Sequence, residues 1–425
     1  MADTYYDRIC DRILSEKLEA KGAVLVKGAK WCGKTTTAAH IAKSVIYMED
    51  PSKKKQYLAI ADMDPAQLLQ GEVPHLIDEW QLAPKLWDAI RFEVDQRDDF
   101  GQFILTGSAV PPDLSEISHT GTGRITSLLM RPMSLFESGE SNGSVSLRGL
   151  FSKEHDVNGI GEQTLEDIAF LICRGGWPKA IGRSKKIALA QAPDYYDAVV
   201  ESDISRVDNV VRDANRARRV LRAYARSVAS EATIASILND VKEDEADSFS
   251  ENTLRSYISA LKKIFVIEDT PAWNPNLRSK TAARSSDTRY FVDPSIATAA
   301  LGIGPNDLIN DLATMGLIFE NLCVRDLRVY AESLDGNVYH YRDKSGLECD
   351  TVIHLKNGRY GLVEIKLGGD KLIEEGAANL LKLKEKIDTD KMGGPAFMMV
   401  LCAVAPFAYK RRDGVFVVPI GCLRN

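Results

Sequence analysis

Residues 28–35 read Gly28-Ala29-Lys30-Trp31-Cys32-Gly33-Lys34-Thr35. This stretch decides the fold of the first part of the chain because it satisfies the pattern G-x-x-x-x-G-K-T. The strand-like run 23–27 precedes it, and the helix-like run 35–44 follows it. Glycines allow such a loop to wrap backbone N–H groups around a phosphate, and the helix N-terminus favours negative charge. The motif and its context therefore predict a phosphate-binding loop between a strand and a helix.

The chemistry expected of this loop is the binding of ATP together with Mg²⁺. We expect Lys34 to reach the β- and γ-phosphates and the Thr35 hydroxyl to ligate Mg²⁺. Trp31 and Cys32 are expected to pack against or flank the nucleotide rather than to react. The full set of expected nucleotide-binding residues is Gly28, Ala29, Lys30, Trp31, Cys32, Gly33, Lys34, Thr35 and Thr36.

A second motif follows about forty residues later, where the apolar run at 75–77 ends in Asp78 and Glu79. It looks like a Walker B strand. We expect Asp78 to hold Mg²⁺ through its water shell and Glu79 to polarise the attacking water as catalytic base. An acidic pair that ends a strand is common, so this assignment depends on the loop at 28–35.

Two further residues are candidates for catalysis beside Glu79 and Lys34. A third predicted strand, 102–105, ends in Thr106-Gly107-Ser108, and we choose Ser108 over Thr106 as the residue that senses the γ-phosphate or orients water. Capping of the strand end is the alternative. Arg124 is expected to supply positive charge to the transition state, in cis or from a neighbouring subunit of a homo-oligomer. The alternative is a solvated arginine.

The distribution of apolar residues predicts three domains. In 1–165, short β-rich runs alternate with helix-like stretches, and several runs are continuously apolar, which favours an α/β core with a mainly parallel sheet covered on both faces. Residues 166–299 are mostly helical, and near their end the order helix, loop, helix, strand predicts a winged helix. Residues 300–425 again alternate helices and strands, which predicts a separate α/β domain.

Seven arginines lie between 206 and 226, next to the predicted winged helix. One interpretation is a face that contacts the phosphates of DNA. The other is a solvated helix whose arginines pair with acidic neighbours. The pattern alone leaves both open.

The order of the motifs resembles a known family. The segments GAKWCGKTTTA, LIDEWQLAP, ILTGSA, GRITSLLMRPMSLFE and RGGWPKA are similar to prokaryotic AAA-type P-loop ATPases that carry a C-terminal DUF4143 domain. The resemblance spans nearly the whole chain. It implies ATP binding, hydrolysis of ATP to ADP and phosphate, and a three-part protein.

The C-terminal region carries Glu320, Asp350 and the triplet Glu364-Ile365-Lys366. This order is similar to that of the PD-(D/E)xK nuclease superfamily, which the DUF4143 domain resembles. The resemblance implies a restriction-endonuclease-like fold. Asp350, Glu364 and Glu320 would then hold a second Mg²⁺, with Lys366 catalytic. The alternative is a surface hairpin with alternating charges.

The hairpin register decides between these interpretations. A two-residue loop at 357–358 places Asp350 and Glu364 on opposite faces. A three-residue loop at 356–358, with Gly358 in the left-handed conformation, places Asp350 directly across from Glu364. In that register Thr351, Ile353 and other residues of the opposite face are expected to supply the apolar core.

Composition narrows the classes of function. The 425 residues carry a net charge of -6, so no global positive field draws the chain onto nucleic acid or anionic lipid. Seven scattered cysteines, no apolar run near the roughly 18 residues that span a bilayer, and a polar N-terminal segment lead us to expect a cytoplasmic protein without a membrane partner. We expect an ATPase that acts as a switch or motor, with DNA as a candidate partner. The alternative is a regulatory ATPase whose C-terminal domain binds a protein.

Overall fold

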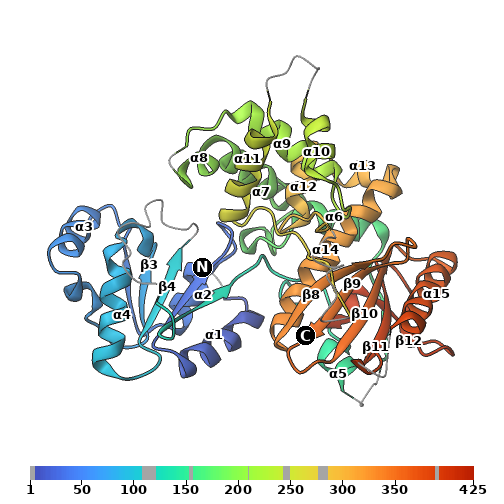
Figure 1. Ribbon diagram of the computed structural model, residues 1–425, viewed down its shortest axis with the longest axis horizontal. Coiled ribbons are helices and arrows are strands. Elements are labelled where there is room, and N and C mark those ends of the chain that lie inside the picture. The colour runs from blue at the N-terminus through green and yellow to red at the C-terminus, as the bar shows by residue number, and fades with distance from the viewer. Residues whose placement is uncertain are drawn as a thin grey trace. The chain divides into compact units, whose positions relative to one another are not determined.

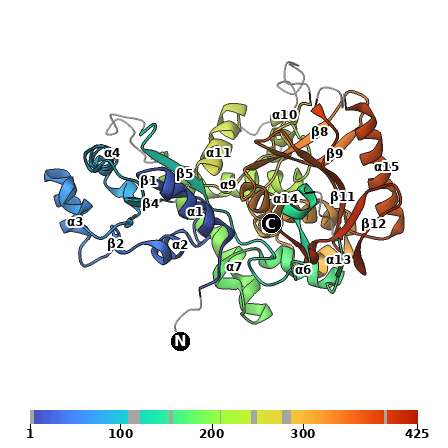
Figure 2. The same cartoon turned by 90° about the horizontal axis from the view of Figure 1, so that it is seen from below.

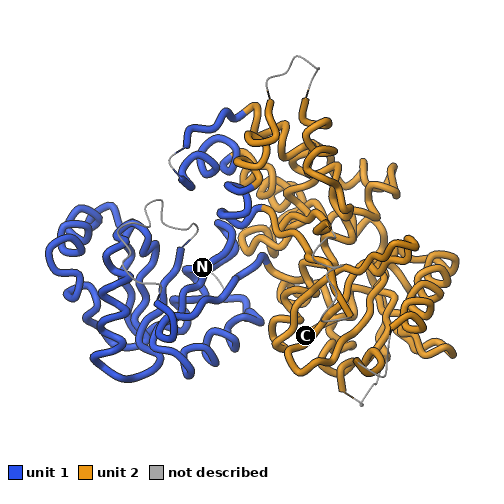
Figure 3. The backbone as a smooth tube through the Cα atoms, in the orientation of Figure 1, with its two compact units in different colours: residues 1–132, 198–214, 259–266 blue, residues 133–197, 215–258, 267–425 orange. Residues whose placement is uncertain are grey.

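The structure is a computed structural model, and it describes residues 5–107, 121–152, 157–208, 210–242, 249–275, 286–387 and 392–425. The chain divides into two compact units, which Figure 3 distinguishes by colour. Unit 1 consists of 1–132, 198–214 and 259–266, and unit 2 of 133–197, 215–258 and 267–425. Among the described residues, no helix combines the length and apolar character needed to cross a membrane.

Unit 1 is built on a five-stranded sheet in the order β2-β3-β4-β1-β5, in which every pair of neighbours is parallel. Its strands are β1 (Ala23–Lys27), β2 (Ser44–Tyr47), β3 (His75–Asp78), β4 (Phe103–Gly107) and β5 (Ile125–Leu129). Its main helices are α1 (Ile9–Ala20), α2 (Lys34–Ile41), α3 (Lys54–Met63) and α4 (Lys85–Arg97). The predicted parallel α/β core is confirmed.

Both faces of this sheet are buried, which explains the continuous apolar runs. On one face Ile77 and Phe103 pack with Ile90 of α4. On the other face Val24 and Ile104 pack with residues of α1 and α2. Because successive side chains of a strand point to opposite faces, a strand covered on both sides has no polar positions to alternate with.

Unit 2 contains a seven-stranded mixed sheet in the order β7-β12-β13-β11-β10-β9-β8. Figures 1 and 2 both show this sheet between the helices α14 (Leu312–Glu332) and α15 (Asp370–Lys386). The strands are β7 (Gly159–Ile160), β8 (Gly336–Arg342), β9 (Glu348–Leu355), β10 (Tyr360–Lys366), β11 (Phe397–Cys402), β12 (Phe407–Lys410) and β13 (Phe416–Pro419).

The remaining helices come mostly from the middle of the chain. They are α5 (Leu147–Phe151), α6 (Leu165–Arg174), α7 (Lys185–Ala198), α8 (Ile204–Arg206), α9 (Ala214–Arg226), α10 (Ile234–Val241), α11 (Glu251–Lys263), α12 (Pro294–Leu301) and α13 (Pro305–Asn310). After α11, Ile267 and Phe291 form an antiparallel bridge, as do Thr270 and Thr288. This order agrees with the predicted helix, loop, helix and strand, while the identification as a winged helix stays a prediction.

The compact units divide the chain differently from the three domains that the sequence predicts. The ATPase region was expected to run to 165, whereas unit 1 ends its first segment at Pro132. The reason is that the backbone after Pro132 bonds to unit 2: the Met133 amide donates to the Gly176 carbonyl at 2.7 Å. Further along, β6 (Val145–Ser146) pairs with β14 (Leu423–Arg424) at the end of the chain.

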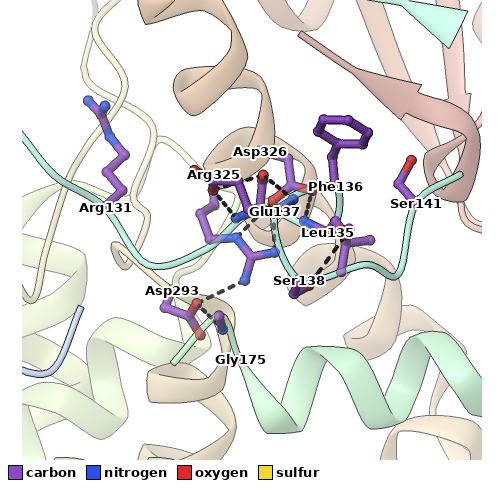
Figure 4. Close-up of polar contacts among 12 residues, drawn as sticks. Arg131, Leu135, Phe136, Glu137, Ser138, Ser141, Gly175, Asp293, Arg325 and Asp326 are labelled. Atoms are coloured by element: carbon purple, nitrogen blue, oxygen red, sulfur yellow. Dashed lines mark hydrogen bonds and ion pairs between the residues drawn. The ribbon is translucent and has the colours of Figure 1, made fainter. Parts of the chain in front are cut away.

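A buried polar network holds this segment in unit 2 (Figure 4). The Leu135 amide donates to Asp326 on α14 at 2.9 Å. Arg325, beside it in sequence, pairs with Asp326 and also with Asp293, its Nη1 lying 2.9 Å from Asp293 Oδ2. Asp293 in turn accepts from the Gly176 amide at 2.9 Å. Buried charges need such partners, so the network links four distant parts of the sequence.

Candidate functional site

The phosphate-binding loop lies between β1 and α2, at the carboxyl edge of the unit 1 sheet. Gly28 and Gly33 have φ of +152° and +102°, and a Cβ on Gly28 would lie 2.0 Å from the Met130 carbonyl oxygen. Only glycine tolerates such backbone geometry and such close approach. The buried Lys34 ammonium donates to the carbonyls of Gly28, at 3.0 Å, and Ala29, at 2.8 Å. Its charge is therefore held inside the loop.

Two hydroxyls converge on Asp78, the last residue of β3. Thr35 Oγ1 donates to Asp78 Oδ1 at 2.7 Å, and Thr106 Oγ1 donates to the same oxygen at 2.5 Å. Parallel pairing places Asp78 beside Thr106 of β4, so the two strand ends meet at the loop. Thr35 and Asp78 are thus brought together as the sequence predicts. A threonine hydroxyl beside a carboxylate is the kind of oxygen set that Mg²⁺ prefers.

Glu79 follows Asp78 in the left-handed conformation, with φ of +56°. Its carboxylate accepts a hydrogen bond from the side-chain amide Nε2 of Gln81. Burial raises the pKa of Glu79, and the Gln81 hydrogen bond and the Lys34 charge offset part of this effect. A carboxylate in this position can accept a proton from water.

Some of the other loop residues are bonded or buried, and others are exposed. Lys30 Nζ lies 2.6 Å from Asp203 Oδ1, and Cys32 is buried, with its carbonyl accepting from Arg8 at 2.9 Å. Trp31 is 47% exposed and has φ of +66°, and Thr36 on α2 is exposed as well. Ala29 is fully buried.

Ser108 lies outside the described residues, so its predicted role stays a prediction. Thr106, which the sequence analysis ranks below it, is the polar residue of β4 that contacts Asp78.

Arg124 is not brought to the phosphate loop of its own chain. Its carbonyl accepts from the amide of Ala23, the first residue of β1, at 3.2 Å, whereas the loop follows the last residue of that strand. At roughly 3.3 Å per residue, the two edges of the sheet are about 13 Å apart. The Arg124 side chain pairs instead with Asp95 of α4. This geometry does not place Arg124 where it could supply positive charge to the phosphate loop of its own chain. A supply of charge by Arg124 from a neighbouring subunit stays a prediction.

The hairpin of β9 and β10 adopts the three-residue loop. Gly358 has φ of +85°, and the Leu355 amide donates to the Arg359 carbonyl at 2.9 Å. Thr351 pairs with Val363, which places Asp350 opposite Glu364 in the same register. Both faces of the hairpin are buried, however, because Val352, Tyr360 and Leu362 belong to a core cluster with α15. The expectation that the opposite face supplies the core was therefore incomplete.

Lys366 is the centre of the C-terminal cluster. Its Nζ lies 2.7 Å from Glu364 Oε2 and 3.2 Å from Asp350 Oδ2. Although burial opposes its charged form, the carboxylates of Asp350 and Glu364 raise the pKa of Lys366. Burial and the Asp350 charge raise the pKa of Glu364 to about 7. The three side chains that the sequence predicts together do converge.

Glu320 also lies near this cluster, but it is hydrogen-bonded to a tyrosine rather than placed as a metal ligand. It accepts a hydrogen bond from the Tyr290 hydroxyl, and burial followed by the Asp350 charge raises the pKa of Glu320 well above its usual range. Among the residues that the structure describes, no group of three His, Cys, Asp or Glu side chains is placed to hold a metal ion. The arrangement is an ion-pair cluster around Lys366, and a shell of three carboxylates is not formed.

Most arginines between 206 and 226 have partners within the protein. Arg212 is buried and makes a two-pronged ion pair with Asp208. Arg226 Nη1 lies 2.6 Å from Asp240 Oδ1, and the Arg216 and Arg219 guanidinium groups each lie 5.7 Å from the Phe249 ring centroid. These contacts favour the interpretation in which the arginines pair internally.

Comparison with known proteins finds matches to three family models along the chain. Residues 20–138 match a family model described as an AAA domain, 165–307 match the domain of unknown function DUF8612, and 315–423 match the domain of unknown function DUF4143. The first part of the chain is therefore similar to AAA domains, and its last part is similar to DUF4143 domains. Uncharacterized proteins of Mycobacterium bovis and Mycobacterium tuberculosis are each 25% identical over 359 residues, which is 83% of this chain and 72% of the relative.

A solved structure, the Walker-type ATPase of Pyrococcus abyssi, is also similar, with 14% identity and a TM-score of 0.43. The match covers 70% of this chain and 96% of that one.

Three residues near the loop were not singled out from the sequence. Arg8 and Asp203 contact loop residues from 24 and 173 positions away, and no spacing rule relates them to the motif. Gln81 lies two residues after Glu79, so its place in the acidic motif is a signal that could have found it.

Proposed function

We propose that the protein is a Mg²⁺-dependent ATPase that converts ATP to ADP and phosphate and acts as a switch or motor. One observation carries this proposal: the Thr35 hydroxyl lies 2.7 Å from the Asp78 carboxylate, beside the buried Lys34. The match of residues 20–138 to an AAA domain supports it.

Each residue then has a distinct task. The loop amides and Lys34 bind the phosphates, for which Lys34 must exchange its bonds to the Gly28 and Ala29 carbonyls. Thr35 and Asp78 would hold Mg²⁺, which when bound supplies positive charge to the phosphate oxygens. Glu79 accepts the proton of the attacking water, and Gln81 orients the Glu79 carboxylate.

The test compares three variants in calorimetry and in a phosphate-release assay. Lys34→Ala should abolish tight ATP binding, because the charge at the phosphates is lost. Glu79→Gln should retain ATP binding and lose hydrolysis. The exposed Lys43 of the same unit provides the control, and Lys43→Ala should leave both unchanged. Wild-type hydrolysis by Glu79→Gln would refute the role of that residue.

A second candidate function, cleavage of DNA, is favoured by the convergence of Asp350, Glu364 and Lys366. In this proposal unit 2 has a restriction-endonuclease-like fold and the two carboxylates bind a divalent cation once Lys366 turns to the scissile phosphate. Mn²⁺-dependent cleavage of duplex DNA should be abolished by Asp350→Ala. A purified wild-type protein that cleaves no DNA would favour the regulatory ATPase whose C-terminal domain binds a protein partner.

Contact with DNA is tested separately from cleavage. Arg222 of α9 is exposed, and reversing it to Glu should weaken binding to duplex DNA and reduce the salt dependence of that binding. Fluorescence anisotropy at about 50 mM salt measures this. No binding by the wild-type protein would exclude DNA as the partner.

A further inference from the structure

The segment 198–214 lies far from the phosphate loop in sequence and belongs to the same compact unit. It forms an ion pair with the loop, between Asp203 Oδ1 and Lys30 Nζ at 2.6 Å. The Asp203 side chain is only 9% exposed, whereas Lys30 is 42% exposed. In the part of the chain that the structure describes, Lys30 is the cation that lies within ion-pair distance of Asp203.

Because Asp203 is buried, its carboxylate depends on the ion pair with Lys30. Asp203 ends a π-helical turn, Val199–Asp203, and such turns occur frequently at functional sites. A buried carboxylate that loses its partner carries a desolvation penalty that nothing offsets. The segment cannot therefore remain unchanged if Lys30 leaves.

The rest of the segment is tied together internally. Arg212 Nη1 donates to the Ile204 carbonyl at 2.9 Å, and the Arg212 amide donates to Ser205 Oγ at 3.0 Å. Arg212 also pairs with Asp208 through both ends of its guanidinium. A displacement of Asp203 is therefore expected to move Ile204, Ser205, Asp208 and Arg212 together.

Lys30 lies between the two glycines of the loop, where phosphates bind. A polyphosphate carries several negative charges and competes with the single carboxylate of Asp203 for the Lys30 ammonium. We propose that Asp203 is a positioning residue that holds Lys30 in the resting loop and releases it to the phosphates, so that segment 198–214 responds to bound nucleotide. This inference rests on the proposed function, because it requires the loop to bind a nucleoside polyphosphate.

A double-mutant cycle measured by calorimetry with ADP and with a non-hydrolysable ATP analogue tests the inference. Asp203→Asn should tighten binding about fivefold, because Lys30 no longer has a competing carboxylate, and Lys30→Met should weaken it about fivefold. In the Lys30→Met background, Asp203→Asn should have no further effect. An equal effect of Asp203→Asn in both backgrounds, or weaker binding in Asp203→Asn alone, would overturn the proposal.

Asp208→Asn is the matched control, since Asp208 lies in the same segment and pairs with Arg212 rather than with the loop. It should leave nucleotide affinity unchanged. Hydrogen exchange of the full-length wild-type protein gives a second measurement: protection of 198–214 should fall when ADP binds, and it should already be low in Asp203→Asn. Unchanged protection would contradict the inference. Absence of any nucleotide binding by the wild-type protein would instead refute the proposed ATPase.

Discussion

At the scale of single residues, the candidate ATPase site depends on how one carboxylate is held. Asp78 accepts from Thr35 of the loop helix and from Thr106 of the neighbouring strand on the same oxygen. The two hydroxyls approach from different elements, so they determine the orientation of the Asp78 side chain. Residues that orient a metal-binding carboxylate affect activity although they contact no substrate.

Replacement of Thr106 by Val is expected to lower ATPase activity by about 10–100-fold while nucleotide affinity is retained. The physical reason is that Asp78 loses one of its two hydroxyl donors while the loop itself is unchanged. Steady-state kinetics and calorimetry measure the two quantities. Thr126→Val, on β5, provides the control because Thr126 pairs with Val24 rather than with the strand of Asp78. Equal activity of Thr106→Val and wild type would contradict this role.

A second residue, His75, links the stability of unit 1 to pH. It is buried at the start of β3, with Nε2 lying 3.1 Å from the Leu68 carbonyl oxygen, and burial lowers the pKa of His75. The unfolded chain therefore binds more protons than the folded chain as pH falls through about 6.5. The stability that His75 contributes is present above that pH and is lost below it.

We expect the melting temperature of unit 1 to fall between pH 7.5 and 5.5, and His75→Gln to reduce this pH dependence. Differential scanning calorimetry at both pH values measures the change. His40→Gln replaces an exposed histidine of the same unit and serves as the control. A pH dependence that is identical in His75→Gln and wild type would refute the assignment.

At the scale of elements, the β9–β10 hairpin shows how one turn decides a site. Its three-residue loop requires a left-handed residue, and Gly358 supplies it with φ of +85°. Because of that loop, Thr351 pairs with Val363 and Asp350 lies opposite Glu364. A loop shorter by one residue would turn Asp350 to the other face.

Gly358→Ala should therefore destabilise unit 2 by about 1 kcal/mol through backbone strain alone, because a Cβ there meets no atom within 4 Å. A decrease of about 2–4 °C in melting temperature is expected. Gly394 is the control, since its added Cβ is equally free and its φ is not in the left-handed region. If Gly394→Ala and Gly358→Ala have the same effect, the strain argument is wrong.

At the scale of the whole molecule, the chain crosses between the units more often than a linear arrangement of domains allows. Unit 1 takes residues from three separate parts of the sequence, and unit 2 begins at Met133. The buried pair of Arg325 with Asp293 and Asp326 joins the start of unit 2 to the helix α14, which also carries Glu320.

Asp326→Asn is expected to lower the free energy of unfolding of unit 2 by about 3 kcal/mol, because Arg325 remains buried with one partner fewer. Chemical denaturation measures the loss in the free energy of unfolding, and hydrogen exchange of α14 provides a second measurement. The surface pair of Lys371 with Glu375 provides the contrast, and Glu375→Gln should change stability by less than about 1 kcal/mol. An effect of similar size for both variants would show that the network adds little.

The sequence by itself determined the parallel α/β core, the loop with Lys34 and Thr35, and the strand that ends in Asp78. These features depend on short-range pattern, because glycine conformation, strand alternation and loop length act over a few residues. Only the tertiary structure decided that Asp203 pairs with Lys30, that Arg124 lies at the far edge of the sheet, and that unit 2 begins at Met133. Those outcomes depend on contacts between residues far apart in the chain. The local sequence pattern does not indicate which distant group will pair with a buried charge or amide.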